Sequence, residues 1–165
     1  MGTRSRIGVM HGDVVKSVYC HWDGYLEHNG KILQQHYDSA KANNLVALGD
    51  ISSLRPEIGV AHPFSVWENN DPNKSKTMTQ TEFDQLYGNM TTFYGRDRDE
   101  QDCSWKVSHS FAEFLQEVEY CGAEYYYIIK DGVWYCGTVH RGTDMTGILV
   151  PLAEALANEL DQEAV

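Results

Sequence analysis

The fold is organised around residues 14–37, VVKSVYCHWDGYLEHNGKILQQHY. Residues 14–22 are rich in β-branched and aromatic side chains, which suit a half-buried strand. Asp23-Gly24 interrupts this run, and a second break at residues 28–30 precedes a segment with helical apolar periodicity. The stretch therefore predicts a strand, a tight polar turn and the beginning of a helix.

Two hairpins are expected. Residues 4–10 can pair with residues 14–22 across a turn at 11–13. In residues 124–136, Asp131-Gly132 separates two β-rich runs and gives the clearest hairpin signal in the chain. The two hairpins predict antiparallel pairing within each half of the chain.

Four helical segments are expected from their start and stop signals. They are residues 31–48 with a break that Asp38-Ser39 can cap, the segments behind the capping boxes Thr79-x-x-Glu82 and Ser110-x-x-Glu113, and residues 147–160 with Pro151 in the first turn. Two hairpins with three or four helices predict an α+β fold: a single antiparallel sheet with the helices mainly on one face. We expect residues 1–165 to form one domain, with a long loop at about residues 50–76 as a lid or partner-binding candidate.

The composition is that of a folded and strongly acidic protein, with 42% hydrophobic residues and a formal net charge of −11. General nucleic-acid binding is not expected, because it requires clustered Lys and Arg. No apolar run is long enough to cross a membrane, and the opening MGTRSRIG has no signal-peptide core. Four cysteines without a Cys-x-x-Cys pair favour free thiols in a reducing cytoplasm. The sequence leaves homo-oligomerisation open.

A ligand site is expected where the strand at 14–22 leads into the helix at 31. Residues 28–31 at a helix start would offer free backbone N–H groups and a cation to an anion. Arg4 and Arg6 share one face of the first strand, and Trp22 and Tyr25 could stack on a base. These features suit a small phosphorylated or nucleotide-like ligand.

The turn itself is expected to be rigid. Asp23-Gly24 and Asn29-Gly30 tolerate positive φ, and the Asp23 carboxylate should accept backbone N–H groups. The predicted ligand-binding residues are Arg4, Arg6, Trp22, Asp23, Tyr25, Asn29, Gly30 and Lys31.

Catalytic and metal sites are weaker alternatives. Cys20, His21 and Asp23 include a nucleophile and a base, but neighbouring residues on a strand point to opposite faces. His109 or His140 could still approach the Cys20 thiol in space. A transition metal on the histidines at 21, 28 and 36 is a further alternative, and no catalytic residue, metal ligand or cofactor is predicted.

A second cationic pair, Arg96 and Arg98, is expected in a solvated turn at residues 95–100, where neighbouring carboxylates screen its charge.

The opening MGTRSRIG, VKSVYCHWDGYLEHNGKILQQHY and LGDISSL resemble a family of small proteins from phages and prophage-bearing bacteria. The family pattern is a Met-Gly-Thr-Arg-Ser start and a Tyr-x-x-x-Asp-Gly-Tyr element, followed by a glycine before a helix. Here it falls on Tyr19, Asp23-Gly24, Tyr25 and Gly30, while Leu26 stands where the family has Pro. The resemblance covers roughly the first third of the chain, with a looser echo in YYYIIKDGVWY. It implies an accessory protein acting in the cytoplasm of a bacterial host and assigns no catalytic residue.

Three functions follow as hypotheses. The first is a non-catalytic protein that antagonises a host defence system by sequestering a small phosphorylated or nucleotide-like ligand. The second is an acidic protein that inhibits a host protein by direct docking. The third is a small hydrolase that uses Cys20 or a histidine-bound metal.

Overall fold

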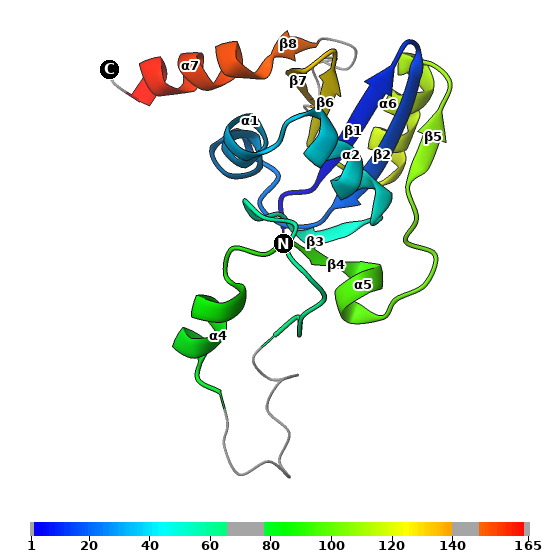
Figure 1. Ribbon diagram of the computed structural model, residues 1–165. Coiled ribbons are helices and arrows are strands. Elements are labelled where there is room, and N and C mark those ends of the chain that lie inside the picture. Colours follow the sequence, from blue (N-terminus) through cyan, green and yellow to red (C-terminus); the bar gives the residue numbers. More distant parts are fainter. Residues whose placement is uncertain (1, 66–77, 140–148, 164–165) are drawn as a thin grey trace.

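The computed structural model describes residues 2–65, 78–139 and 149–163, and Figure 1 shows how their helices and strands are arranged. In this part of the chain, eight strands form one mixed sheet in the order β4-β3-β2-β1-β6-β7-β8, and β5 pairs with β2. The strands are β1 (Ser5–His11), β2 (Val14–Cys20), β3 (Ile51–Ser53), β4 (Thr92–Phe93), β5 (Lys106–Ser108), β6 (Tyr125–Lys130), β7 (Val133–Thr138) and β8 (Val150–Pro151).

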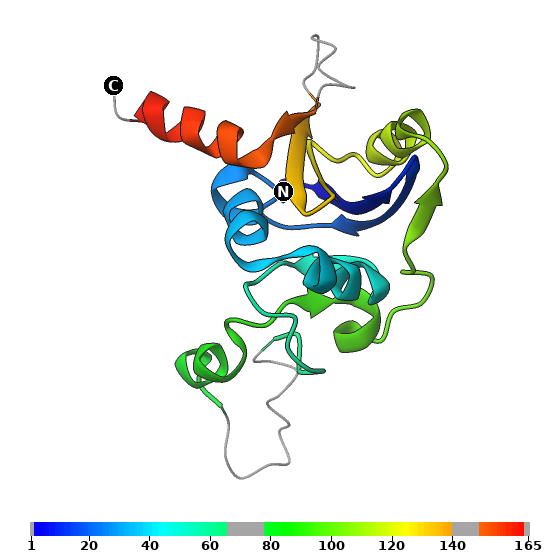
Figure 2. The same ribbon diagram turned by 45° about the horizontal axis from the view of Figure 1, so that its top comes forward.

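Helices cover both faces of the sheet (Figure 2). The helices are η1, a short π-helix (Leu26–Gly30), and α1 (Lys31–His36), α2 (Ser39–Ala47), α4 (Gln80–Tyr87), α5 (Tyr94–Arg98), α6 (Phe111–Tyr120) and α7 (Leu152–Glu163). On one face, β1, α1, α2 and α7 contribute Ile7, Leu33, Leu45 and Leu152 to a larger apolar core. On the other face, α6 covers a smaller cluster with Phe114 and Val118. None of the helices in the described ranges is long and apolar enough to cross a membrane.

The prediction of a single antiparallel sheet built from two hairpins with three or four helices is wrong. Both predicted hairpins form, but β1 also pairs in parallel with β6 (Ser5↔Tyr125), and β2 pairs in parallel with β3 (Cys20↔Ile51). β1 is buried at six of its seven positions, because it lies between two strands and under helices on both faces. Such a central strand cannot show the alternation that marks a half-exposed hairpin.

The helix-start signals are confirmed by side-chain caps. The Lys41 N–H donates to Asp38 Oδ1 at 2.8 Å, which separates α1 from α2 as predicted. Thr79 and Ser110 accept the N–H groups of Glu82 and Glu113 at 3.2 and 3.1 Å, respectively.

Three other local predictions are corrected. The predicted loop at 50–76 contains β3; its residues 66–77 lie outside the described ranges. The predicted turn at 95–100 contains most of α5 instead. The last helix begins at Leu152, after β8, whereas its predicted start at Gly147 lies outside the described residues.

The α6 cluster occupies only one end of its sheet face. Along the paired strands, Met10 lies opposite Val15, whereas Arg6 lies opposite Tyr19. Met10 and Val15 belong to the apolar cluster under α6, but Arg6 and Tyr19 do not. The same face therefore changes from apolar to polar toward the C-terminal end of β2.

Candidate functional site

The candidate site lies at this polar end of the sheet, where the start of β1, the end of β2 and α5 meet. It consists of the cationic patch, defined by Arg4, Tyr19, His21, Trp22, Tyr94 and Arg98. Arg4 precedes β1 by one residue and is exposed. The alternation of side chains along a strand puts Tyr19 and His21 on the same face.

A short hydrogen bond fixes the imidazole of His21. The Tyr19 hydroxyl lies 2.6 Å from His21 Nδ1. Burial raises the pKa of Tyr19 to about 12, so the phenol keeps its proton and donates it to Nδ1. The neutral imidazole then carries its own proton on Nε2.

Two arginines add positive potential around this imidazole. Burial lowers the pKa of His21, and the positive charges of Arg4 and Arg98 lower it further. His21 is therefore a neutral hydrogen-bond donor near two permanent cations, in a chain whose net charge is −11.

Aromatic rings hold Arg98 in place. Its guanidinium lies 5.1 Å from the ring centroid of Tyr94 and 4.9 Å from that of Phe64, within the range of cation–π contacts. The Arg98 Nε also lies 3.3 Å from Glu100 Oε2. Three contacts thus fix one of the two cations before any ligand arrives.

Trp22 forms an aromatic border of the patch. Its side chain is 44% exposed, and the His21 ring packs edge-on against it with the centroids 4.6 Å apart. A Cβ on Gly2 would lie 2.7 Å from both the Trp22 ring and the carbonyl oxygen of His21. The start of the chain is therefore packed closely against one side of the indole.

Arg6 lies beneath the patch, not in it. It is 3% exposed, and its Nε and Nη2 donate to Ser17 Oγ at 2.8 Å and Ser17 O at 3.3 Å. Asp50 Oδ1 accepts the N–H of Tyr19 at 2.9 Å. Burial raises the pKa of Asp50, and the nearby charges of Arg6 and Lys106 oppose that shift. Arg6 and Asp50 thus support the sheet behind the patch.

Asn29 and Gly30 are buried, and Lys31 is not among the charged groups that act on His21. Asn29 is buried, and its amide donates to Ser5 Oγ at 3.2 Å, Cys20 Sγ at 3.3 Å and Trp22 O at 3.4 Å. α1 begins at Lys31 as expected, but η1 leads directly into it, so the helix has no free N-terminus there. The Gly30 N–H already donates to Tyr25 O at 3.4 Å, and the φ of Gly30 is −58°, not positive. This segment therefore offers no free helix start at Lys31.

The turn at Asp23 is tight as predicted, but it is held differently. Asp23 has a φ of 56°. The backbone carries the turn, with Gly24 N–H donating to Thr3 O at 2.8 Å and Asn29 N–H to Asp23 O at 3.2 Å. The Asp23 carboxylate accepts a 3.3 Å bond from the Tyr25 hydroxyl instead of the expected backbone N–H. Of the eight predicted ligand-binding residues, only Arg4 and Trp22 lie in the patch.

Cys20 has the properties of a structural thiol. It is fully buried, and burial raises its pKa to about 11, which leaves almost no thiolate at neutral pH. Its strand neighbour His21 belongs to the opposite face. Among the described residues, no three His, Cys, Asp or Glu side chains gather closely enough to bind a metal ion. His140 lies outside the described ranges.

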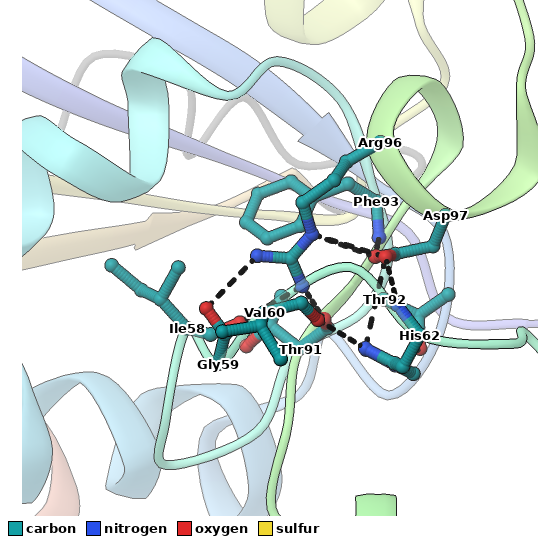
Figure 3. Close-up of polar contacts among 9 residues, drawn as sticks. All are labelled: Ile58, Gly59, Val60, His62, Thr91, Thr92, Phe93, Arg96 and Asp97. Atoms are coloured by element: carbon teal, nitrogen blue, oxygen red, sulfur yellow. Dashed lines mark hydrogen bonds and ion pairs between the residues drawn. The ribbon is translucent and has the colours of Figure 1, made fainter.

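A second polar cluster, centred on the buried Asp97, connects the loop after β3 to α5 (Figure 3). The carboxylate accepts the N–H groups of His62 at 3.1 Å and Phe93 at 2.8 Å, and Arg96 Nε at 3.0 Å. The Arg96 guanidinium also donates to the carbonyl groups of Ile58, Gly59 and Thr91. The prediction that Arg96 lies in a solvated turn is therefore wrong.

This cluster contains a histidine and an aspartate, but its geometry is structural. His62 Nδ1 lies 2.7 Å from Val60 O and 3.7 Å from Asp97 Oδ1, so it donates to the carbonyl. Its Nε2 lies 3.3 Å from Thr92 Oγ1, and the ring stacks on Tyr87 at 5.4 Å. Both ring nitrogens are used within the fold, and the cluster serves to clamp the loop.

Sequence reasoning missed Tyr19, Tyr94 and Arg98 as site residues and considered His21 only as a catalytic base or a metal ligand. Alternation along β2 could have linked Tyr19 to His21, but nothing local indicates that α5 meets the end of this strand. In comparisons with known proteins, no family model matches the sequence, and no curated protein or solved structure is detectably similar to the chain.

Proposed function

We propose that the protein binds a small phosphorylated, nucleotide-like ligand at the cationic patch without changing it chemically. One observation carries the proposal: the charges of Arg4 and Arg98 both act on the neutral donor His21, which lies beside the exposed ring of Trp22. Two cations from distant segments thus influence one imidazole in a strongly acidic chain, although Arg98 is also paired with Glu100.

A phosphate group matches the donors of the patch. Guanidinium groups form charge-assisted and often bidentate hydrogen bonds with phosphate oxygens. The Nε2–H of His21 adds a third donor, because Nδ1 is occupied by the Tyr19 hydroxyl. Arg98 is already fixed by its aromatic contacts, so binding sacrifices little of its side-chain freedom.

A planar base matches the aromatic border. The Trp22 indole is 44% exposed directly beside His21, and stacking on an aromatic ring contributes about 1–3 kcal/mol per base. A ligand with one phosphate and one base can therefore engage donors and ring together.

Capture without cleavage is supported by the chemistry of the neighbouring groups. The nearest candidate nucleophile, Cys20, is buried and protonated. His21 has a neutral donor on its free side and a phenol on the other, so it is not arranged as a general base. The resemblance to phage proteins supports the biological role proposed with this chemistry, antagonism of a host defence system by sequestration in the bacterial cytoplasm.

The test is calorimetry of the full chain with a panel of cyclic and linear nucleotides, followed by heat denaturation and recovery of the ligand. Intact recovered ligand supports sequestration, and altered ligand shows an enzyme instead. If no member of the panel binds, the small-ligand function is wrong.

Variants locate the site. Arg4→Ala and Trp22→Ala should each weaken binding about tenfold or more without changing the thermal melt, because each is exposed. Lys31→Ala is the matched control, since it removes one positive charge that does not act on His21. Equal weakening by Arg4→Ala and Lys31→Ala would show that only the overall charge matters and that the patch is not the site.

A further inference from the structure

A cavity separate from the cationic patch lies between the end of α1, the turn of the β6–β7 hairpin and the start of α7. Figure 1 shows α1 next to the start of α7. The cavity has a volume of about 480 Å³, which is within the range of cavities that bind small molecules. Its lining includes Gln34, His36, Asp38, Gly132, Pro151 and Ala153, and none of its lining residues belongs to the cationic patch.

The end of α1 supplies free backbone acceptors at this cavity. The N–H of Tyr37, the residue after α1, donates to Leu33 O. The carbonyl groups of Gln34, Gln35 and His36 accept no hydrogen bond from the described part of the chain. Uncapped carbonyl groups at the C-terminal end of a helix carry a partial negative charge and favour a cation.

Asp38 adds a carboxylate to these acceptors. It is exposed, and its Oδ1 accepts the N–H of Lys41 at 2.8 Å. The Lys41 ammonium does not neutralise this carboxylate, because Nζ donates to Pro56 O at 2.6 Å and lies 3.5 Å from Glu57 Oε2. Asp38 therefore has no ion-pair partner among the described residues.

Another part of the lining is apolar. Pro151 and Ala153, at the start of α7, line the cavity and are exposed to solvent. None of the described residues that line it is Lys or Arg. Lys130 of the same hairpin pairs with Met10, a residue of the α6 cluster, whereas the cavity-lining Trp134 belongs to the core on the other face of the sheet. The cavity thus combines an apolar wall with acceptors and an unpaired carboxylate.

We propose that this cavity binds a small aliphatic amine. The ammonium group donates to the free carbonyl groups at the end of α1 and pairs with Asp38, and the hydrocarbon chain packs against Pro151 and Ala153. A primary ammonium has three N–H donors and no acceptor, which suits a site rich in carbonyl oxygens. Charge alone is not enough, because a trimethylated ammonium has the same charge and no N–H group.

The test is a titration of the full chain at pH 8 with butylamine, 1,4-diaminobutane, butyltrimethylammonium and butanol. Calorimetry gives the affinities. The Trp134 Nε1–H donates to Tyr37 O at 2.9 Å, and both residues line the cavity, so the indole resonance of Trp134 in NMR spectra reports occupancy.

We expect both amines to shift the Trp134 indole resonance and to bind about tenfold or more tightly than butyltrimethylammonium and butanol. Asp38→Asn should weaken amine binding about tenfold and leave the fold intact, because asparagine caps a helix as well as aspartate does. Asp13→Asn is the matched control. It removes the same charge from an exposed residue that does not line the cavity, and it should leave the affinity unchanged.

A second variant fills the cavity without touching the charged groups. Ala153→Leu places a larger side chain in the lining, at an exposed position of α7 where leucine is a good helix former, and should weaken amine binding about tenfold or more. Ala157→Leu, one turn further along α7, is exposed and does not line the cavity, so it should have no effect on binding.

Three outcomes would overturn the proposal. The first is that neither amine binds, and the second is an affinity that Ala153→Leu does not change. The third is equal binding of butylamine and butyltrimethylammonium, or equal weakening by Asp38→Asn and Asp13→Asn, which would show only a general attraction of cations to an acidic protein.

Discussion

Asp97→Asn should destabilise the protein although it changes only one oxygen into an NH₂ group. In the native structure, Oδ1 accepts from His62 N–H and Arg96 Nε, and Oδ2 accepts from Phe93 N–H. An asparagine has a single acceptor oxygen, so either orientation of the amide turns its NH₂ group toward a donor. Asp97 is 7% exposed, and water cannot readily replace the lost partner.

The expected cost is about 1.5–6 kcal/mol of the free energy of unfolding, because one or two hydrogen bonds to a charged acceptor contribute about 1.5–3 kcal/mol each. Against a typical total of about 5–15 kcal/mol, this loss is large. Urea unfolding followed by circular dichroism measures this loss of stability. Amide hydrogen exchange at His62 and Phe93 reports whether the cluster around Asp97 opens locally before global unfolding.

Asp99→Asn is the matched control for Asp97→Asn. Asp99 is exposed and has a φ of 55°, which asparagine adopts readily, so its substitution should change stability by less than about 0.5 kcal/mol. If Asp97→Asn changes the stability as little as Asp99→Asn does and leaves hydrogen exchange at His62 and Phe93 unchanged, the hydrogen bonds of Asp97 do not contribute to stability as their geometry indicates.

Three further predictions concern the sheet. Asn29→Ala should lower the free energy of unfolding, measured with urea, by about 1–3 kcal/mol, because it removes the buried amide that donates to Ser5, Cys20 and Trp22. A smaller loss of stability would show that water replaces the amide. Gly137→Ala should cost about 1–3 kcal/mol or more, because its Cβ would overlap the ring of Tyr126, and an unchanged melting temperature would contradict that packing. Asp50→Asn keeps the acceptor for the Tyr19 N–H but removes a carboxyl whose folded-state pKa is raised by burial. Because burial raises the folded-state pKa of Asp50, the wild type loses stability as the pH rises from the unfolded-state pKa of about 4 through the folded-state pKa. The stability of Asp50→Asn relative to wild type should therefore increase as the pH rises above about 4, and a flat difference would refute the argument.

Short-range signals in the sequence predicted the local structure well. The hairpin at Asp131-Gly132 forms with φ values of 51° and 79°, because these two residues suit the left-handed turn conformation. The cap at Asp38 works in the same way, since it depends only on a side chain three residues before its donor. These signals act within a few residues, so the sequence displays them directly.

The sheet order could not be predicted, because it depends on distant pairing. Ser5 pairs with Tyr125 and Cys20 with Ile51, and neither pair leaves a local pattern in the chain. Residues 51–53 form a strand inside a segment rich in loop signals, where the parallel edge of β2 overrides local propensity.

The candidate site was predicted only in part, for two physical reasons. Alternation correctly grouped Arg4 with Arg6, but charge led us to expect both at the surface, and Arg6 is instead buried against Ser17. The second reason is α5, whose arginines were expected to be screened by neighbouring carboxylates. In the structure Asp97 turns inward, whereas Arg98 is paired with Glu100 at 3.3 Å and also packs on the rings of Tyr94 and Phe64 at the patch.

The cluster around Asp97 and the cationic patch are structurally linked. Asp97 accepts the N–H of Phe93, the residue before α5, and so fixes the start of the helix that carries Arg98 at its end. The same carboxylate accepts the N–H of His62 and holds the loop that brings Phe64 against the Arg98 guanidinium. A residue that touches no ligand thus positions one of the two cations of the patch. It follows that the location of Arg98 depends on bonds between three distant segments, which explains why reasoning from the local sequence placed the site around residues 23–31 and missed Arg98.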